Sequence, residues 1–408
     1  MTSSRRERLI PLLVGLALGV LACEVVVRVG SQSDLDGNQR FGRVWLKPYH
    51  VPVRRLEHNL AKYEALPVRS EVYDPDLGWA PHAHTRSHDG IYCYDPDGIR
   101  ADSIDARHAP TPKPGVLRIE LLGDSFTNGA EVPFPRTWGH CLEAELQRRG
   151  VQAEVLNLGV RGYGLDQALL RWRKLGRQLH PGLVVLGFQP ENMERDQNLI
   201  RALYTALDWF PFSKPRFLLE QDSLRLVNVP AVPPESVPGI VAHIGAWPLR
   251  PYEGFYHPED YAAHAWESSR FLALLVGTID RRWGREAARE ASFDSSRSAP
   301  GRLALAIIGE LRSEVQAAGA QFLVVDLPNR DDMHEFVRGR GIQPDADMLL
   351  EMRRRFPMIE TAGALRAEAD ATSLDSLFMP DAHYSPAANR TVGTVVARRI
   401  AGPGPGRP

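Results

Sequence analysis

Two short segments far apart in the sequence carry the residue types needed for serine-dependent acyl transfer. Ser125 stands in Gly123-Asp124-Ser125, and Asp381 and His383 lie near the C-terminus. A serine hydroxyl is a poor nucleophile at neutral pH, so it needs a base and a group that orients the base. We expect Asp381 to hold the imidazole of His383 in the tautomer whose free nitrogen takes the Ser125 proton.

Neither segment is specific when it is taken alone. An Asp-Ser pair after a strand more often forms a helix cap than a nucleophile, and a histidine in a loop is usually only solvated. Asp375 or Asp326 could also supply the acid, but neither lies as close to His383 in the sequence as Asp381 does. The order of the surrounding elements therefore has to support the chemistry.

The sequence around Ser125 predicts a buried strand followed by a helix. Residues 116–122 are mostly apolar and end at Gly123, and further strands and helices alternate after them. We expect strands at 153–158, 183–186 and 321–327 and helices at 137–149, 166–177, 303–318 and after Pro386. This alternation predicts an α/β fold, a three-layer α/β/α sandwich with a mainly parallel sheet. Ser125 would then lie at the carboxyl edge of the sheet, with its own N–H directed toward a forming oxyanion.

Four blocks in this order resemble the SGNH/GDSL hydrolase family, which also has a flavodoxin-like fold. Ser125 matches the first block, Asn157 to Gly164 is similar to the second, Gly187 to Asn192 to the third, and Asp381 to Pro386 to the fourth. The resemblance implies that the N–H groups of Ser125 and Gly162 and the side chain of Asn192 form an oxyanion hole. Gly159 is the weaker choice for the second block.

Two departures from the family pattern bear on what the resemblance implies. Met193 stands where the third block usually has an aspartate, and extra residues precede Asn192. Asp381 and His383 are two residues apart rather than three. That spacing resembles a membrane-anchored bacterial branch that O-acetylates polysaccharides, including alginate acetyltransferases, alongside esterases.

The N-terminus predicts a membrane segment. Three arginines precede an apolar run from Leu9 to Val27 whose one charge is Glu24. The run is about long enough to cross a bilayer, and the arginines favour a cytoplasmic N-terminus with the following domain outside the cytoplasm, in the periplasm. A retained single-pass anchor is favoured, while a cleaved signal peptide, or a lipoprotein processed at Cys23, remains open.

The chain divides into four segments in this interpretation. Residues 1–30 form the anchor or signal, 31–114 a membrane-proximal stalk and cap, 115–400 the hydrolase-like domain, and 401–408 a disordered tail. Residues 197–300 interrupt the alternation and are expected to be an insertion that folds over the site. Segments 73–79 and 95–100 are expected to be surface turns, and Trp79, Tyr163 and Tyr384 to pack rather than stack on a sugar.

The composition narrows the function. With 408 residues, 43% of them hydrophobic, and a formal net charge of −1, the chain can bury a core but has no field that would attract nucleic acid. Three scattered cysteines suggest no metal site, and no cofactor motif is present. We expect an ester hydrolase or O-acyltransferase acting outside the cytoplasm on acylated carbohydrate or cell-surface polysaccharide. The alternative is a non-catalytic glycan-binding or assembly protein with the same fold. The sequence does not determine the oligomeric state.

Overall fold

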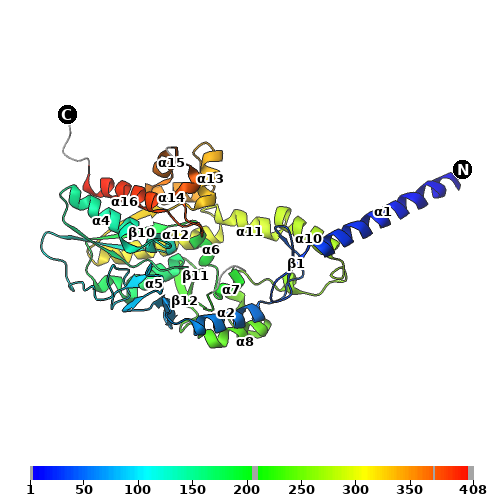
Figure 1. Ribbon diagram of the computed structural model, residues 1–408, viewed down its shortest axis with the longest axis horizontal. Coiled ribbons are helices and arrows are strands. Elements are labelled where there is room, and N and C mark those ends of the chain that lie inside the picture. The colour runs from blue at the N-terminus through cyan, green and yellow to red at the C-terminus, as the bar shows by residue number, and fades with distance from the viewer. Residues whose placement is uncertain (1–2, 205–209, 371–372, 403–408) are drawn as a thin grey trace.

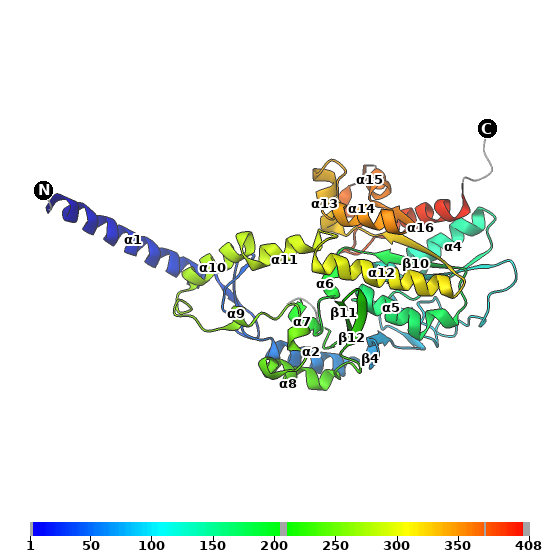
Figure 2. The same ribbon diagram turned by 180° about the vertical axis from the view of Figure 1, so that it is seen from behind.

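A five-stranded sheet forms the centre of the computed structural model, which describes residues 3–204, 210–370 and 373–402 (Figures 1 and 2). Its strands, in spatial order, are β9 (Ala153–Asn157), β8 (Leu117–Leu122), β10 (Leu183–Phe188), β13 (Gln321–Asp326) and β14 (Met358–Glu360). All four pairings are parallel. This is the doubly wound, flavodoxin-like strand order, and it confirms the predicted α/β class.

Helices cover both faces of the sheet, as the pattern predicts. Leu121 and Val185 face a core that includes residues of α4 (Trp138–Arg148) and α16 (Pro386–Ala401). Leu122 and Leu186, their neighbours along the strands, face a second core with α5 (Leu165–Lys174) and α12 (Ala299–Ala317). Successive side chains of a strand point to opposite faces, so the apolar residues of β8 and β10 contribute to both cores.

The segment between β13 and α16 holds elements that are not among the strands and helices expected above. They are α13 (Arg330–Arg338), α14 (Ala346–Arg355), strand β14 and α15 (Ala362–Asp370). With only three residues, β14 is shorter than the runs by which a strand is recognised in a sequence. Its pairing with β13 comes from tertiary packing.

The N-terminal cap, residues 31–114, contains more regular structure than expected. It holds one helix and three small groups of antiparallel strands. The helix is α2 (Val53–Ala65), and the strands are β1 (Gln32–Ser33), β2 (Gln39–Phe41) and β3 (Val44–Trp45); β4 (Glu71–Asp74) with β5 (Gly78–Pro81); and β6 (Thr85–Arg86) with β7 (Cys93–Tyr94). Leu56, Leu60 and Tyr63 lie on one face of α2, a helical spacing that the sequence does contain.

The two segments expected to be surface turns are exposed at their tips, at Pro75, Asp76 and Asp97, while their C-terminal ends are buried. Trp79 and Ile99, at the ends of segments 73–79 and 95–100, are 0% and 1% exposed. The buried carboxylate of Asp95 accepts the N–H groups of Asp97 and Ile99, which satisfies the turn from within. Turn chemistry was therefore recognised, but its exposure depends on what packs over it.

The insertion folds into short elements that pack on the cap. They are α7 (Arg201–Tyr204), the hairpin β11 (Arg216–Glu220) and β12 (Ser223–Val227), α8 (Val237–Ala242), α9 (Pro258–Tyr261), α10 (Arg270–Trp283) and α11 (Arg285–Phe293). Helix α8 packs on α2, and Phe210 and Phe212 stack on Trp79. Trp79, Tyr163 and Tyr384 are all buried, so the expectation that they pack is confirmed.

Helix α1 (Ser3–Gly30) projects away from the rest of the molecule (Figures 1 and 2). Residues 10–30 are long and apolar enough to cross a membrane, and a signal sequence would have the same character. Most of the apolar side chains from Ile10 to Val26 are exposed, as they would be in a helix whose surroundings are lipid.

Candidate active site

Ser125 occupies the sharp turn at the carboxyl end of β8, where the strand order reverses. Gly123 turns the chain with φ 146°, and a Cβ there would lie 2.3 Å from Oγ1 of Thr127, so the turn requires glycine. Asp124 then caps α3 (Ser125–Asn128) by accepting the N–H of Phe126 at 2.9 Å. The predicted cap and the nucleophile position are thus neighbouring residues of one turn.

The hydroxyl and the backbone N–H of Ser125 have no hydrogen-bond partner among the residues that the structure describes. The first N–H groups of a helix lack intrahelical acceptors, and Asp124 satisfies only that of Phe126. Ser125 therefore presents both a nucleophile and a donor at the same point, as expected for the start of an oxyanion hole.

His383 is paired with Glu131, a residue that the sequence analysis did not select. Nδ1 of His383 lies 2.8 Å from Oε2 of Glu131. Asp381, which was expected in that position, is exposed and instead donates its backbone N–H to Oε1 of Glu131 at 3.1 Å. The chain turns at Ala382, with φ 71°, so that the N–H groups of Asp381 and His383 both point to the Glu131 carboxylate.

The surroundings of the Glu131 carboxylate favour its ionised form. Partial burial works to raise its pKa, but hydrogen bonds from the His383 ring and from the N–H groups of Asp381 and His383 outweigh burial and hold the pKa below its ordinary value of 4.5. An ionised carboxylate at Nδ1 fixes the tautomer that leaves Nε2 free to accept a proton.

Packing holds the His383 ring beside the nucleophile turn. Its ring centroid lies 5.3 Å from that of Phe126, the residue after Ser125. The next residue, Tyr384, packs edge-on against Phe126 at 4.9 Å and donates its hydroxyl to the carbonyl of Pro328 at 2.8 Å. The loop that carries His383 is therefore held against α3 by two ring contacts with Phe126, and the hydrogen bond from Tyr384 to Pro328 fixes it further.

Gly162 supplies a second free N–H on the neighbouring loop. It has φ 77°, in a turn closed by the N–H of Tyr163 and the carbonyl of Val160 at 3.3 Å. The N–H of Gly162 has no acceptor among the described residues. This agrees with the role that the family resemblance implies for Gly162, while the N–H of Gly159 is bound to the side chain of Asn157 at 3.0 Å.

The side chain of Asn192 hydrogen-bonds to protein groups, whereas the resemblance implies that it donates to an oxyanion. Its Nδ2 donates to Oδ2 of Asp124 at 2.9 Å and to the carbonyl of Tyr163 at 3.3 Å, and its Oδ1 accepts the N–H of Gln189 at 2.9 Å. In this arrangement Asn192 positions the nucleophile turn. An oxyanion would have to displace the longer of its two donated bonds to receive a hydrogen bond from it.

Arg195 is a further residue of the site that the sequence analysis missed. It lies one helical turn after Asn192 in α6 (Glu191–Arg195), and its Nη1 donates to Oδ2 of Asp124 at 2.7 Å. Both side chains are buried. Burial works to lower the pKa of Arg195, but the carboxylates of Glu191 and Asp124 raise it further. The i,i+3 spacing from Asn192 was a signal that could have identified Arg195.

The other acids weighed from the sequence lie elsewhere. Asp326 is buried at the end of β13 and accepts from Gln343 at 3.1 Å, while Asp375 is exposed and lies 3.4 Å from Nε2 of His334. Within the described ranges, no group of three or more His, Cys, Asp or Glu side chains could hold a metal ion.

Replacement of Gly162 by alanine should weaken both the fold and the site. The new Cβ would meet the Trp79 ring at 3.3 Å, and the left-handed backbone should cost about 1–3 kcal/mol of unfolding free energy. We also expect kcat for a short ester to fall, because strain moves the N–H. Urea unfolding and steady-state kinetics test this. Gly309→Ala, in α12 with nothing within 4 Å of its Cβ, is the control and should be neutral or stabilising. An unchanged kcat in Gly162→Ala would contradict a role for the Gly162 N–H in stabilising the oxyanion.

Comparisons with known proteins give structural likenesses only. No protein-family model and no curated protein matches the chain. Similar solved structures include a lipase/acylhydrolase from Enterococcus faecalis (14% identity, 70% of this chain and 95% of that chain, TM-score 0.34). They also include a catalytic mutant of an acetylxylan esterase from Geobacillus stearothermophilus (11% identity, 70% of this chain and 94% of that chain, TM-score 0.34). A third is a two-domain esterase active on acetylated mannans (12% identity, 72% of this chain and 52% of that chain, TM-score 0.34).

At these TM-scores the likenesses carry no argument about chemistry, so the assignment rests on the molecule itself. The parallel sheet in flavodoxin-like order, the serine at the carboxyl end of β8, the glycine loop after β9 and the histidine before α16 follow one another as the four sequence blocks do. Together they show a doubly wound, flavodoxin-like α/β fold that carries the residues of the four blocks in the expected order.

Proposed function

We propose that the protein is a serine-dependent ester hydrolase or O-acyltransferase that acts outside the cytoplasm on acylated carbohydrate. The observation that carries this proposal is the Glu131–His383 pair packed against the turn that presents Ser125. In serine-dependent acyl transfer the imidazole moves the proton of the serine hydroxyl, while the carboxylate orients the imidazole and stabilises its charged form.

The proposed reaction begins with Ser125. Nε2 of His383 takes the hydroxyl proton as Oγ attacks the acyl carbonyl, and the Glu131 carboxylate stabilises the imidazolium that forms. The N–H groups of Ser125 and Gly162 donate to the oxyanion of the tetrahedral intermediate. The imidazolium then gives its proton to the departing alcohol, which leaves an acyl ester on Ser125.

The acyl ester is released by a second alcohol or by water. His383 takes a proton from the acceptor oxygen, the acceptor attacks the acyl carbonyl, and the proton returns to Oγ of Ser125. Water as the acceptor gives hydrolysis, and a sugar hydroxyl gives O-acylation. The resemblance of the fourth block to the polysaccharide-acetylating branch, together with the proposed external location, supports acylated carbohydrate as the substrate class.

The test of this function uses the full chain in detergent micelles. We expect release of p-nitrophenol from p-nitrophenyl acetate and covalent labelling of Ser125 by a fluorophosphonate, located by peptide mass spectrometry. Ser125→Ala should lose both, with an unchanged melting temperature. A folded wild-type protein that is not labelled would refute catalysis. If, in addition, the Ser125→Ala variant replaces the wild-type protein in cells that lack it without loss of function, the non-catalytic glycan-binding alternative is favoured.

A second part of the proposal is that α1 is retained as a membrane anchor. Glu24, the one charge of its apolar run, accepts hydrogen bonds from Oγ of Ser269 (2.7 Å) and from the N–H groups of Arg270 (3.0 Å) and Phe271 (2.9 Å), the first residues of α10. A cut at the end of the apolar run would remove this cap from α10. The cap that Glu24 provides for α10 therefore favours a protein that keeps α1 over one that is cleaved after Glu24.

Processing at Cys23 would leave Glu24 in place, so it needs its own test. We expect the protein to stay in the membrane fraction after a high-pH carbonate wash and intact-mass analysis to find residues 1–22 still attached. Cys23→Ser should change neither result, because Cys23 is an unpaired, exposed thiol in α1. Release of Cys23→Ser into the soluble fraction would instead show lipidation at that cysteine.

A further inference from the structure

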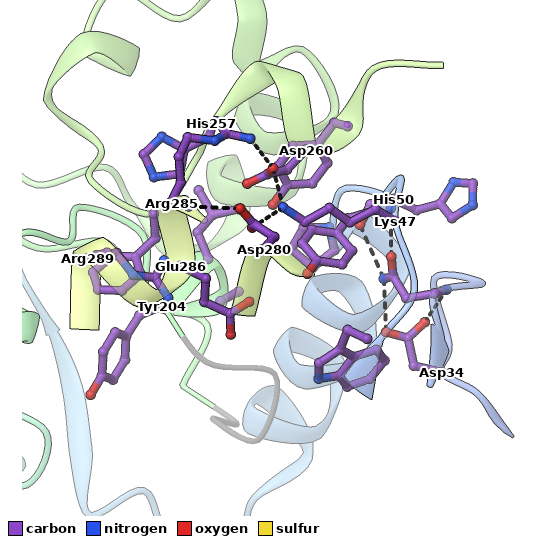
Figure 3. Close-up of a pocket in the computed structure, with 18 of the residues that line it drawn as sticks. Asp34, Lys47, His50, Tyr204, His257, Asp260, Asp280, Arg285, Glu286 and Arg289 are labelled. Carbon is purple, nitrogen blue, oxygen red and sulfur yellow. Dashed lines mark hydrogen bonds and ion pairs between the residues drawn. The ribbon is translucent and has the colours of Figure 1, made fainter. Parts of the chain in front are cut away.

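A cavity of about 230 Å³ lies between the N-terminal cap and the insertion (Figure 3). We call it the cap pocket. Its walls come from residues 34–55, 202–204, 255–261 and 280–289. None of Ser125, Glu131, Gly162, Asn192 and His383 lines it. The cap pocket is therefore separate from the acyl-transfer site and is built by the two segments that lie outside the five-stranded sheet.

Buried ion pairs hold the walls of the cap pocket together. Nζ of Lys47, in the cap, lies 2.6 Å from Asp260 and 2.5 Å from Asp280, both in the insertion. Arg285 also donates to Asp260 at 2.6 Å (Figure 3). Lys47 is only 7% exposed, so these contacts are little screened by solvent. The pocket is preformed, which lowers the entropic cost of binding a ligand.

Several polar side chains in the cap pocket have no hydrogen-bond partner among the described residues. Five lining side chains make no hydrogen bond to any described residue: Tyr49, His257, Tyr261, Glu286 and Arg289. Burial raises the pKa of the Tyr49 and Tyr261 hydroxyls and lowers that of His257, so at neutral pH all three are uncharged groups that can both donate and accept. Partly buried groups of this kind gain most from a ligand that carries hydroxyls.

The same pocket offers aromatic surface. The rings of Tyr49 and Tyr261 lie 6.0 Å apart at 77°, and those of Tyr204 and Phe255 lie 5.0 Å apart at 84°. Trp45 completes the lining. Aromatic rings present an apolar face with a polar edge or tip nearby. A ligand with both C–H faces and hydroxyl groups would match this surface.

The charges of the pocket balance. Its cations are Lys47, Arg55, Arg285 and Arg289, and its carboxylates are Asp34, Asp260, Asp280 and Glu286, which is four against four when histidines are neutral. A balanced pocket does not favour an anionic ligand over a neutral one. Its volume of about 230 Å³ is below the roughly 300–1,000 Å³ of pockets for drug-sized ligands, which suits one sugar ring.

A chain of hydrogen bonds joins the wall of the cap pocket to the nucleophile turn. The hydroxyl of Tyr204 donates to Oε1 of Glu191, and Oε2 of Glu191 accepts from Nη2 of Arg195 at 2.7 Å. Nη1 of Arg195 donates to Asp124 at 2.7 Å, and Asp124 caps α3 at Phe126. Hydrogen bonds therefore connect the pocket wall to Asp124, the residue before Ser125.

We propose that the cap pocket is a recognition site for a neutral sugar residue of the glycan on which the enzyme acts. The identity of the glycan as substrate rests on the proposed function, whereas binding of a neutral sugar rests on the pocket alone. The aromatic faces would pack on the ring, and Tyr49, Tyr261 and His257 would bind its hydroxyls. The acyl group would be processed elsewhere on the same glycan.

The test measures binding without turnover. Full-length Ser125→Ala protein in micelles is titrated with cellotetraose, mannotetraose, xylotetraose and chitotetraose, with tetragalacturonate and glycerol phosphate as anionic probes. We expect at least one neutral tetrasaccharide to bind with a Kd of about 1 mM or tighter. The double variant Tyr49→Phe/Tyr261→Phe keeps the rings but loses both hydroxyls, and it should weaken that binding about tenfold or more.

Tyr256→Phe is the matched control, because Tyr256 packs on Tyr261 with ring centroids 4.8 Å apart but does not line the pocket. It should leave the affinity unchanged. All variants should keep the wild-type melting temperature, since the hydroxyls removed from Tyr49 and Tyr261 have no partner. In a Ser125 background, the double variant should keep its kcat for p-nitrophenyl acetate.

The outcomes separate this proposal from the proposed function. No binding by any neutral tetrasaccharide, or equal binding by the double variant, would overturn the sugar site even if Ser125 is labelled by fluorophosphonate. Binding of glycerol phosphate alone, lost in Arg289→Gln, would also overturn it in favour of an anionic headgroup. Tyrosine-dependent sugar binding by a protein that does not hydrolyse esters would support the pocket and refute catalysis.

Discussion

Replacement of Glu131 by glutamine should lower kcat for p-nitrophenyl acetate by about 10²–10⁴-fold, with little change in KM. Glutamine keeps the size of the side chain but removes the charge that stabilises the imidazolium of His383, and it no longer dictates the tautomer. Asp381→Asn is the matched control, because the Asp381 side chain is exposed and reaches Glu131 only through its backbone N–H. We expect that control to change kcat by less than about threefold.

The pH dependence of stability gives an independent readout of Glu131. Because its pKa in the folded protein is below 4.5, the carboxylate contributes stability above its ordinary pKa, and this contribution is lost as the pH falls through the folded value. The difference in unfolding free energy between wild type and Glu131→Gln should therefore be constant near neutral pH and shrink below pH 4.5. An equal loss of kcat in Asp381→Asn and Glu131→Gln would return the orienting role to Asp381.

Replacement of Arg195 by methionine should lower the free energy of unfolding by about 3–5 kcal/mol. The reason is that Asp124, 1% exposed, would keep a buried charge whose remaining side-chain partner is the neutral amide of Asn192. Removal of one member of a buried ion pair costs more than the pair contributes, because the other charge is left desolvated. Urea unfolding measures this loss, and kcat should also fall because Asp124 caps the helix that carries Ser125.

Two further variants separate loss of the ion pair from loss of a large side chain. The double variant Arg195→Met/Asp124→Asn removes the stranded charge and should recover part of the lost stability, since asparagine can still accept the N–H of Phe126. Arg225→Met removes an arginine from an exposed pair with Glu220 and should have no measurable effect. If Arg195→Met is as stable as Arg225→Met, the ion pair with Asp124 does not hold the nucleophile turn.

The local elements of the hydrolase domain were predictable because each is specified by residues close together in the sequence. The mostly apolar segments 116–122 and 183–186 predicted buried strands, and Thr137 and Pro386 marked where helices begin. The positions of Ser125, Gly162 and His383 follow from those elements, since the carboxyl ends of parallel strands meet at one edge of the sheet.

The acid of the site and the shape of its surroundings depended on the tertiary structure. Glu131 and His383 are 252 residues apart, and which carboxylate reaches Nδ1 is set by the backbone turns at Glu131 (φ 66°) and Ala382 (φ 71°), which no spacing rule reveals. Asn192 is directed to Asp124 rather than to the oxyanion because Asp124 is buried and needs donors. The cap pocket likewise depends on long-range packing, in which Lys47 contacts Asp260 and Asp280 across more than two hundred residues of sequence. Sequence therefore determined which residues stand at the sheet edge, while long-range packing and the need to satisfy buried charges determined how those residues pair.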